Sequence, residues 1–365
     1  MSLKDVVGQD KAVGILIRTI RRGRVPSSYI FAGESGIGKK LAALNLAKAL
    51  NCIGKGRPSE DRGLLDNLSA SSAGTDSEID ACDECSSCLR IDKGIHPDFL
   101  LIAPESGQIR IEEIRAIDDA LSLKAFEGKY KVVIVDDADT MNQYAANAFL
   151  KTLEEPPENS LIVLISSNPD HLPDTIKSRC SRVNFTPLSD ESCTRVIEKV
   201  MGRQLSDVSQ GKKKKKDDAS KTSVLPDPGT VSLLVRLSMG RPGYALSEGL
   251  IEERQWFFGL LKGMLQAEKD SWASREEMER WFDFMLLLLR DMTVLKITDS
   301  ESPLINRDMR DYINTLSSSM DLKVIIEIYM KLNALRGYSN FNLNKSLTWN
   351  YAGSLLRARM DVANA

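Results

Sequence analysis

The stretch Gly33-Glu34-Ser35-Gly36-Ile37-Gly38-Lys39-Lys40 decides the fold. An apolar run, 29–32, precedes it, and a run rich in helix-forming residues, 41–50, follows it. A buried strand, a glycine-rich turn with a lysine, and a helix form the context that a phosphate-binding loop requires. Glycines let backbone N–H groups approach the phosphates, and the helix N-terminus adds partial positive charge. We therefore expect a nucleotide-binding loop formed by Gly33, Gly36, Gly38 and Lys39.

The residue after Lys39 departs from this pattern. A competent loop carries Ser or Thr there, because the hydroxyl ligates Mg²⁺. Lys40 is a cation without an acceptor atom, so it cannot hold the metal. Two interpretations remain open: a nucleotide site that binds weakly or never hydrolyses its ligand, and a loop kept only as a structural turn.

A second motif, Lys131 to Asp139, consists of an apolar strand followed by acids. Ligands of open α/β sheets bind at the carboxyl ends of the strands, so Asp136 is expected to hold Mg²⁺. The next position normally carries a glutamate that polarises the attacking water. Asp137 is one methylene shorter, and its carboxylate stops about 1.5 Å short. Asn168, after the apolar run 161–165, is a candidate γ-phosphate sensor, or alternatively a cap or turn residue.

The order of apolar runs predicts the fold class. Strands are expected at 29–32, 96–102, 132–135, 161–165 and 182–185, with helical segments between them. Strands that alternate with helices form a parallel, doubly wound sheet. From about residue 250 the pattern is purely helical, and Ser274 opens a helix as part of a capping box. The chain is therefore predicted to be α/β, with an all-α remainder.

The cysteines predict a metal site. Three of them follow one another at two-residue spacing and a fourth lies upstream: Cys52, Cys82, Cys85 and Cys88. Four thiolates are the preference of structural zinc, and such a site is closed to substrates. Free buried thiols, the alternative, seldom show two consecutive gaps of this kind. Cys180 and Cys193 are interpreted as ordinary buried thiols.

Length and charge set further bounds. A chain of 365 residues predicts two or three domains. The net charge of -2 excludes a global field that attracts DNA or a membrane, so any such contact must be local. No apolar run approaches the roughly 20 residues of a membrane-spanning helix, and we expect a cytoplasmic protein. The run Lys212–Lys216 lies in a polar segment, 205–224, interpreted as a disordered loop, with a nucleic-acid tether as the alternative.

Several motifs occur together and in order: the loop, the four cysteines, His96-Pro97-Asp98, Asp136-Asp137-Ala138-Asp139, Leu153-Glu154-Glu155-Pro156-Pro157 and Ser178-Arg179-Cys180. With them the sequence resembles the delta-prime family of clamp-loader subunits of bacterial DNA polymerase III, strongly over 1–190. The resemblance implies an AAA+ domain at 1–187 with a zinc insertion at 52–95, a helical lid at 188–248, and a helical collar at 249–365.

The resemblance also implies a division of roles. In this family the arginine of Ser-Arg-Cys is supplied in trans, so Arg179 would reach ATP on a neighbouring gamma or tau subunit. The lid arginine of active relatives is replaced here by Gly243. This implies a subunit that is no catalyst alone, and the departures make binding of ATP and Mg²⁺ in its own site doubtful. Its implied partners are gamma or tau and delta subunits in a hetero-pentameric ring, the sliding clamp and primed DNA.

Two other functions compete with this hypothesis. A self-sufficient ATPase of the gamma or tau kind needs Ser or Thr at 40 and Glu at 137, and neither is present. A zinc-dependent DNA-binding protein would use the cysteine cluster to contact DNA. The acids around the cluster, Asp80, Asp83 and Glu84, argue against it.

Overall fold

The computed structural model describes residues 1–54, 80–104, 107–209, 228–247, 249–266, 272–298, 303–318, 320–338 and 343–359. The chain divides into two compact units, described here one at a time. The first comprises Met1–Val200 and Met239–Tyr244, and the second Met201–Ser238 and Ala245–Ala365. The division into three domains with boundaries at 187 and 248 stays a prediction.

The first unit is built on a five-stranded sheet with the order β2-β3-β4-β1-β5, all of it parallel. The strands are β1 (Ser28–Ala32), β2 (Phe99–Ile102), β3 (Lys131–Val135), β4 (Ser160–Ser166) and β5 (Ser181–Asn184). All five predicted strands are confirmed. β1 lies between β4 and β5, so the loop that follows β1 leaves the sheet near its middle.

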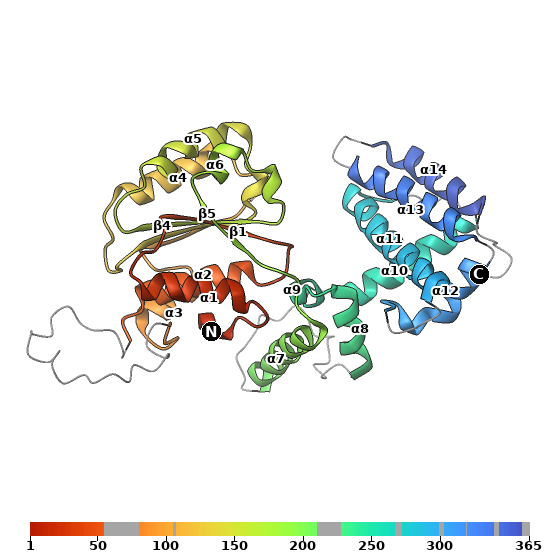
Figure 1. Ribbon diagram of the computed structural model, residues 1–365, viewed down its shortest axis with the longest axis horizontal. Coiled ribbons are helices and arrows are strands. Elements are labelled where there is room, and N and C mark those ends of the chain that lie inside the picture. The colour runs from red at the N-terminus through yellow and green to blue at the C-terminus, as the bar shows by residue number, and fades with distance from the viewer. Residues whose placement is uncertain are drawn as a thin grey trace, which may run out of the picture. The chain divides into compact units, whose positions relative to one another are not determined.

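Helices cover both faces of this sheet (Figure 1). One face carries α1 (Asp10–Arg21), α2 (Lys39–Asn51) and α3 (Ser86–Asp92), and the other carries α4 (Ile111–Ser122), α5 (Gln143–Glu154) and α6 (Asp174–Lys177). Short 3₁₀ turns lie at η1 (Leu3–Asp5), η3 (Ala138–Thr140) and η4 (Pro169–His171). The predicted α/β class is confirmed by this arrangement.

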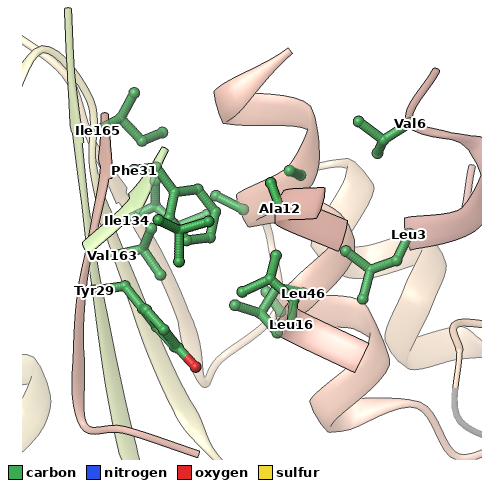
Figure 2. Close-up of a cluster of buried hydrophobic side chains, with 14 of the residues drawn as sticks. Leu3, Val6, Ala12, Leu16, Tyr29, Phe31, Leu46, Ile134, Val163 and Ile165 are labelled. Carbon is green, nitrogen blue, oxygen red and sulfur yellow. The ribbon is translucent and has the colours of Figure 1, made fainter. Parts of the chain in front are cut away.

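Successive side chains of the central strands enter different cores, because a strand alternates its faces. Tyr29 and Phe31 belong to the core beneath α1 and α2, whereas Ile30 and Ala32 belong to the core beneath α4 and α5. Figure 2 shows the first of these cores, where Phe31 faces toward the helices that carry Leu16 and Leu46. Burial on both faces explains why these strands read as unbroken apolar runs.

Three further helices follow β5 along the chain: α7 (Asp190–Ser209), α8 (Pro228–Ser238) and α9 (Pro242–Ala245). The backbone of α7 is helical to Ser209, so the first residues of the predicted loop 205–224 are helical. The run Lys212–Lys216, and with it the prediction for that run, lies outside the described residues.

The described part of the second unit consists of helices. After α8, which belongs to this unit, they are α10 (Leu250–Leu265), α11 (Arg275–Thr298), η5 (Arg307–Met309), α12 (Arg310–Ser318), α13 (Leu322–Gly337) and α14 (Lys345–Arg357). The Ser274 hydroxyl accepts the Glu277 N–H at 3.2 Å, as the predicted capping box requires. The predicted apolar side of α11 is buried, and it includes Trp281 and Leu288. Among the described residues, no helix is long and apolar enough to cross a membrane.

Candidate functional site: a phosphate loop, an acidic strand end and a cysteine cluster

The predicted phosphate loop connects β1 to α2 and has the expected conformation. Gly33, Gly36 and Gly38 have φ values of 148°, 78° and 97°, and Gly38 is the N-cap of α2. Gly36 requires glycine for a second reason: a Cβ there would lie 2.9 Å from the Tyr244 nitrogen. The predicted glycines therefore form a tight turn that leads directly into a helix.

Lys39 is held inside this turn. Its Nζ donates to the carbonyl oxygens of Gly33 at 2.5 Å and Glu34 at 2.6 Å, and to Ser167 Oγ at 3.4 Å. The residue is buried, and burial lowers the pKa of the Lys39 ammonium, although the nearby acids, Asp137 first among them, act in the opposite direction. The cation therefore lies where a phosphate held by the loop would meet it.

Lys40 lies beside the first acid of the second motif. Its Nζ is 3.0 Å from Asp136 Oδ2, and the two side chains are 47% and 18% exposed. Asp137 follows in the left-handed region, at φ 45°, and caps η3. Partial burial, together with the charges of Asp136 and Asp139, raises the pKa of Asp137. The acid expected to hold Mg²⁺ thus has a lysine ammonium as its partner.

Asn168 and its neighbour Ser167 lie at the end of β4. The Asn168 side-chain nitrogen is 3.2 Å from His171 Nε2, and the residue is exposed at the start of η4. The hydroxyl of Ser167 is the group that reaches Lys39, and its backbone N–H donates to Asp139 at 3.1 Å. The role of Asn168 as a γ-phosphate sensor stays a prediction, and Ser167 was not predicted. The polar run Ser166-Ser167-Asn168 contains no signal that singles out its middle member.

The segment after α8 packs directly on the loop. The Gly243 N–H donates to the Gly36 carbonyl at 2.8 Å, and a Cβ at 243 would lie 2.8 Å from Gly36 Cα. Arg241 lies 3.6 Å from the Glu34 carboxylate and over the ring of Tyr244. No side chain fits at 243 unless the loop moves, which gives a physical reason for glycine at this position.

Arg179 lies at the surface, just after α6. Its Nη2 donates to Glu154 Oε1 at 2.5 Å, and its Nη1 donates to the Thr175 carbonyl at 2.8 Å. Its side chain is 33% exposed and that of Glu154 is 50% exposed. Glu154 ends α5, just before Pro156 and Pro157, which stop the helix. The guanidinium is thus fixed at two points and still accessible.

The four predicted cysteines come together. The Sγ atoms of Cys52, Cys82, Cys85 and Cys88 all lie within 4.8 Å of one another. Zn–S bonds of about 2.3 Å in a tetrahedron need sulfurs just under 4 Å apart, so this donor set fits the metal after a small contraction. A Cβ on Gly54 would lie 2.6 Å from Cys82 Sγ, so glycine is needed for the sulfurs to meet.

Hydrogen bonds favour the thiolate form at Cys85, whereas burial raises the pKa of Cys52 and of Cys88. The backbone N–H of Cys85 donates to Cys82 Sγ, and that of Cys88 donates to Cys85 Sγ. Burial acts to raise the pKa of Cys85, but hydrogen bonds from the backbone of Cys88 and Ile53 outweigh it and lower the pKa to about 6. Of the other two thiols, Cys193 is buried and Cys180 is half-buried.

The acids near the cluster bind the chain itself. Asp80 accepts the N–H groups of Leu3 and Lys4 at 2.9 and 3.0 Å. Asp83 lies 2.6 Å from the ammonium of Lys48, a fully buried residue of α2. These contacts fasten the cysteine segment to η1 and α2, which indicates a structural role for the cluster.

Comparisons with known proteins agree with this geometry. A sequence model of the family described as DNA polymerase III, delta subunit, matches residues 8–189. The delta-prime subunit of DNA polymerase III from Bacillus subtilis (strain 168) is 29% identical over 308 residues, 82% of this chain and 82% of that protein. The chain belongs to the DNA polymerase III delta-subunit family.

Gamma and tau subunits of DNA polymerase III are also similar in sequence to this chain, but the similarity covers only part of each of those proteins. The tau subunit of Escherichia coli (strain K12) is 30% identical over 55% of this chain, but over 28% of its own length. A solved gamma subunit-related protein from Thermotoga maritima, 20% identical, aligns with 95% of this chain and 98% of its own at a TM-score of 0.39.

Proposed function

We propose that this family member works in the clamp loader of bacterial DNA polymerase III as a stator that does not hydrolyse ATP. It offers Arg179 in trans to ATP bound by a neighbouring gamma or tau subunit. With these and a delta subunit it forms a hetero-pentameric ring in the cytoplasm, which places the sliding clamp on primed DNA. The four cysteines hold structural zinc.

One contrast carries the proposal. Groups that the chain would need for its own hydrolysis are missing or already paired. The hydroxyl at position 40 is replaced by a lysine, which forms an ion pair with the metal-binding candidate Asp136. The lid arginine is replaced by Gly243. Arg179, in contrast, is fixed by Glu154 and the Thr175 carbonyl yet remains a third exposed. A guanidinium stabilises the charge on a transferring phosphoryl group, an effect of about 10³–10⁵ in rate.

The alternatives are less well supported. A self-sufficient ATPase would need to free Asp136 from Lys40 and still lacks a hydroxyl at 40. A zinc-dependent DNA-binding protein would need its cysteine segment available, whereas Asp80 and Asp83 bind that segment to the rest of the unit. Purified alone, the chain should therefore show no steady turnover of ATP.

The test replaces Arg179 with alanine in a complex reconstituted from all its subunits. Arg182→Ala is the matched control, because Arg182 is also exposed and its Nε donates only within β5, to Asn184 at 2.7 Å. The Arg179 variant should assemble normally and lose at least about 10³-fold of the ATPase rate of the complex, while the control stays near wild type. A rate within about twofold of wild type in both variants would show that the finger assignment is wrong.

A further inference from the structure

The contact between Lys40 and Asp136 removes a Mg²⁺-binding hydroxyl and also places a positive charge beside the strand-end acid. Lys40 is the second residue of α2, the position where a competent loop carries its metal-binding hydroxyl. A hydroxyl there reaches the strand-end acid only through the metal that lies between them. The lysine stem is longer, and its ammonium reaches Asp136 Oδ2 directly at 3.0 Å.

The two adjacent lysines have separate partners. Lys39 turns inward to the carbonyls of Gly33 and Glu34 and to Ser167, while Lys40 turns to the acid at the end of β3. The Lys39 ammonium therefore lies where a phosphate would bind. The Lys40 ammonium lies where the divalent metal ion that accompanies the phosphate would bind. A divalent ion at Asp136 would have to displace Lys40 and would be repelled by it.

We propose that the Lys40 ammonium is a resident cation that replaces the divalent metal ion of this site. The loop then takes a polyphosphate, free or as part of a nucleotide, only in its metal-free form. Lys40 supplies one positive charge where Mg²⁺ would supply two, so the affinity is lower than that of a metal-dependent loop. Arg179 has no part in this inference, which can fail while the proposed function stands.

The test compares the full-length wild-type chain with Lys40→Ser. Lys11→Ser is the matched control, because Lys11 is the second residue of α1 and is exposed. The proteins are saturated with zinc and desalted into Mg²⁺-free buffer without a chelator, which would also strip the cysteine cluster. Thermal unfolding is then followed with ATP or tripolyphosphate, each with and without Mg²⁺, and bound Mn²⁺ is counted by electron paramagnetic resonance.

In the wild type and in Lys11→Ser, metal-free ATP or tripolyphosphate should stabilise the chain at least as well as its Mg²⁺ complex, with no Mn²⁺ bound at the loop. In Lys40→Ser, Mg²⁺ should raise the affinity for the same ligand about tenfold or more, and Mn²⁺ should bind with it. A stronger effect of ATP than of tripolyphosphate identifies a nucleotide as the ligand, and equal effects identify a free polyphosphate. Both results support the inference.

Three results would overturn it. They are a wild type stabilised more by the Mg²⁺ complex, a Lys40→Ser chain without Mg²⁺ dependence, and a wild type that neither ligand stabilises. If Lys40→Ser does not fold, Asp136→Asn serves instead. It removes a negative charge from the site, so metal-free ATP should bind at least as tightly as in wild type and Mn²⁺ should still be absent. Bound Mn²⁺ in that variant contradicts the inference.

Discussion

Asp98, the acid of the His96-Pro97-Asp98 motif, fixes the turn that leads into β3, and its replacement by asparagine tests that role. Its Oδ1 accepts the N–H of Phe126 at 2.7 Å. Its Oδ2 accepts the N–H groups of Glu127 at 2.8 Å and Gly128 at 2.7 Å. The residue is 2% exposed, so water cannot replace these acceptors.

The loss of stability in Asp98→Asn can be worked out from the three N–H donors. Asparagine offers one acceptor oxygen and one NH₂ group, so its best orientation keeps two of the three bonds and turns a donor toward the third N–H. A hydrogen bond to a charged group is worth about 1.5–3 kcal/mol, and the two bonds that remain become neutral and weaker. We expect Asp98→Asn to lower the free energy of unfolding of the first unit by about 2–4 kcal/mol.

The loss should depend on pH. Burial acts to raise the pKa of Asp98, but the N–H donors of Phe126, Gly128 and Glu127 outweigh it, and the pKa in the folded chain lies below the usual 3.8. The carboxylate therefore stabilises the fold above the unfolded-state pKa of about 3.9, and this contribution disappears as the pH falls through the folded-state pKa. Asparagine does not titrate, so the difference between the two proteins should shrink on acidification.

Hydrogen exchange over residues 123–135, followed by mass spectrometry, measures this effect locally. Tryptophan fluorescence does not report it, because all four tryptophans lie in the second unit: Trp256, Trp272, Trp281 and Trp349. Asp119→Asn, at an exposed position of α4, is the matched control. A stability difference below about 1 kcal/mol near neutral pH, or one that stays constant to about pH 3, would refute the reasoning.

Three further changes test other contacts. Cys88→Ser removes one of four sulfurs and should weaken zinc binding more than about a hundredfold, measured by metal analysis after dialysis; full retention of zinc argues against the cluster. Gly243→Ala places a Cβ 2.8 Å from Gly36 Cα and should cost about 1–3 kcal/mol in thermal unfolding, whereas wild-type stability means that the close approach is absent. Glu154→Gln should cost less than about 1 kcal/mol, because both side chains of its pair with Arg179 are partly exposed; a larger loss makes that arginine structural.

The central strands β3 and β4 could be predicted from sequence because they are buried on both faces. Each reads as an unbroken run of apolar, mostly β-branched residues, as in Val132 to Val135. The edge strand β5 buries only Val183, so its pattern is weaker. The cysteine cluster could be predicted for a related reason. Three of its members are close in sequence, and a tetrahedral ion needs only one more.

The contacts that decide the chemistry could not be predicted in the same way. The pairs Lys40 with Asp136, and Gly36 with Gly243, join residues far apart in the chain. Neither leaves a periodic pattern, because each depends on how a loop lies against its neighbour. Once the sheet is known, a lysine at the start of α2 and an acid at the end of β3 fall at the same edge, but β4 separates β1 from β3, so the sheet alone does not bring them into contact.

Packing alone requires two glycines of the phosphate loop, Gly33 and Gly36, so their presence does not identify a ligand. A Cβ at Gly33 would lie 2.5 Å from the Phe185 carbonyl oxygen, and one at Gly36 would lie 2.9 Å from the Tyr244 nitrogen. Both positions would need glycine even if the loop never met a phosphate. Evidence about the ligand must therefore come from side chains that packing does not demand. Lys40 is such a residue: it is 47% exposed, so its pairing with Asp136 adds little stability. The lysine at that position is therefore better explained by the charge it brings to the site than by the fold.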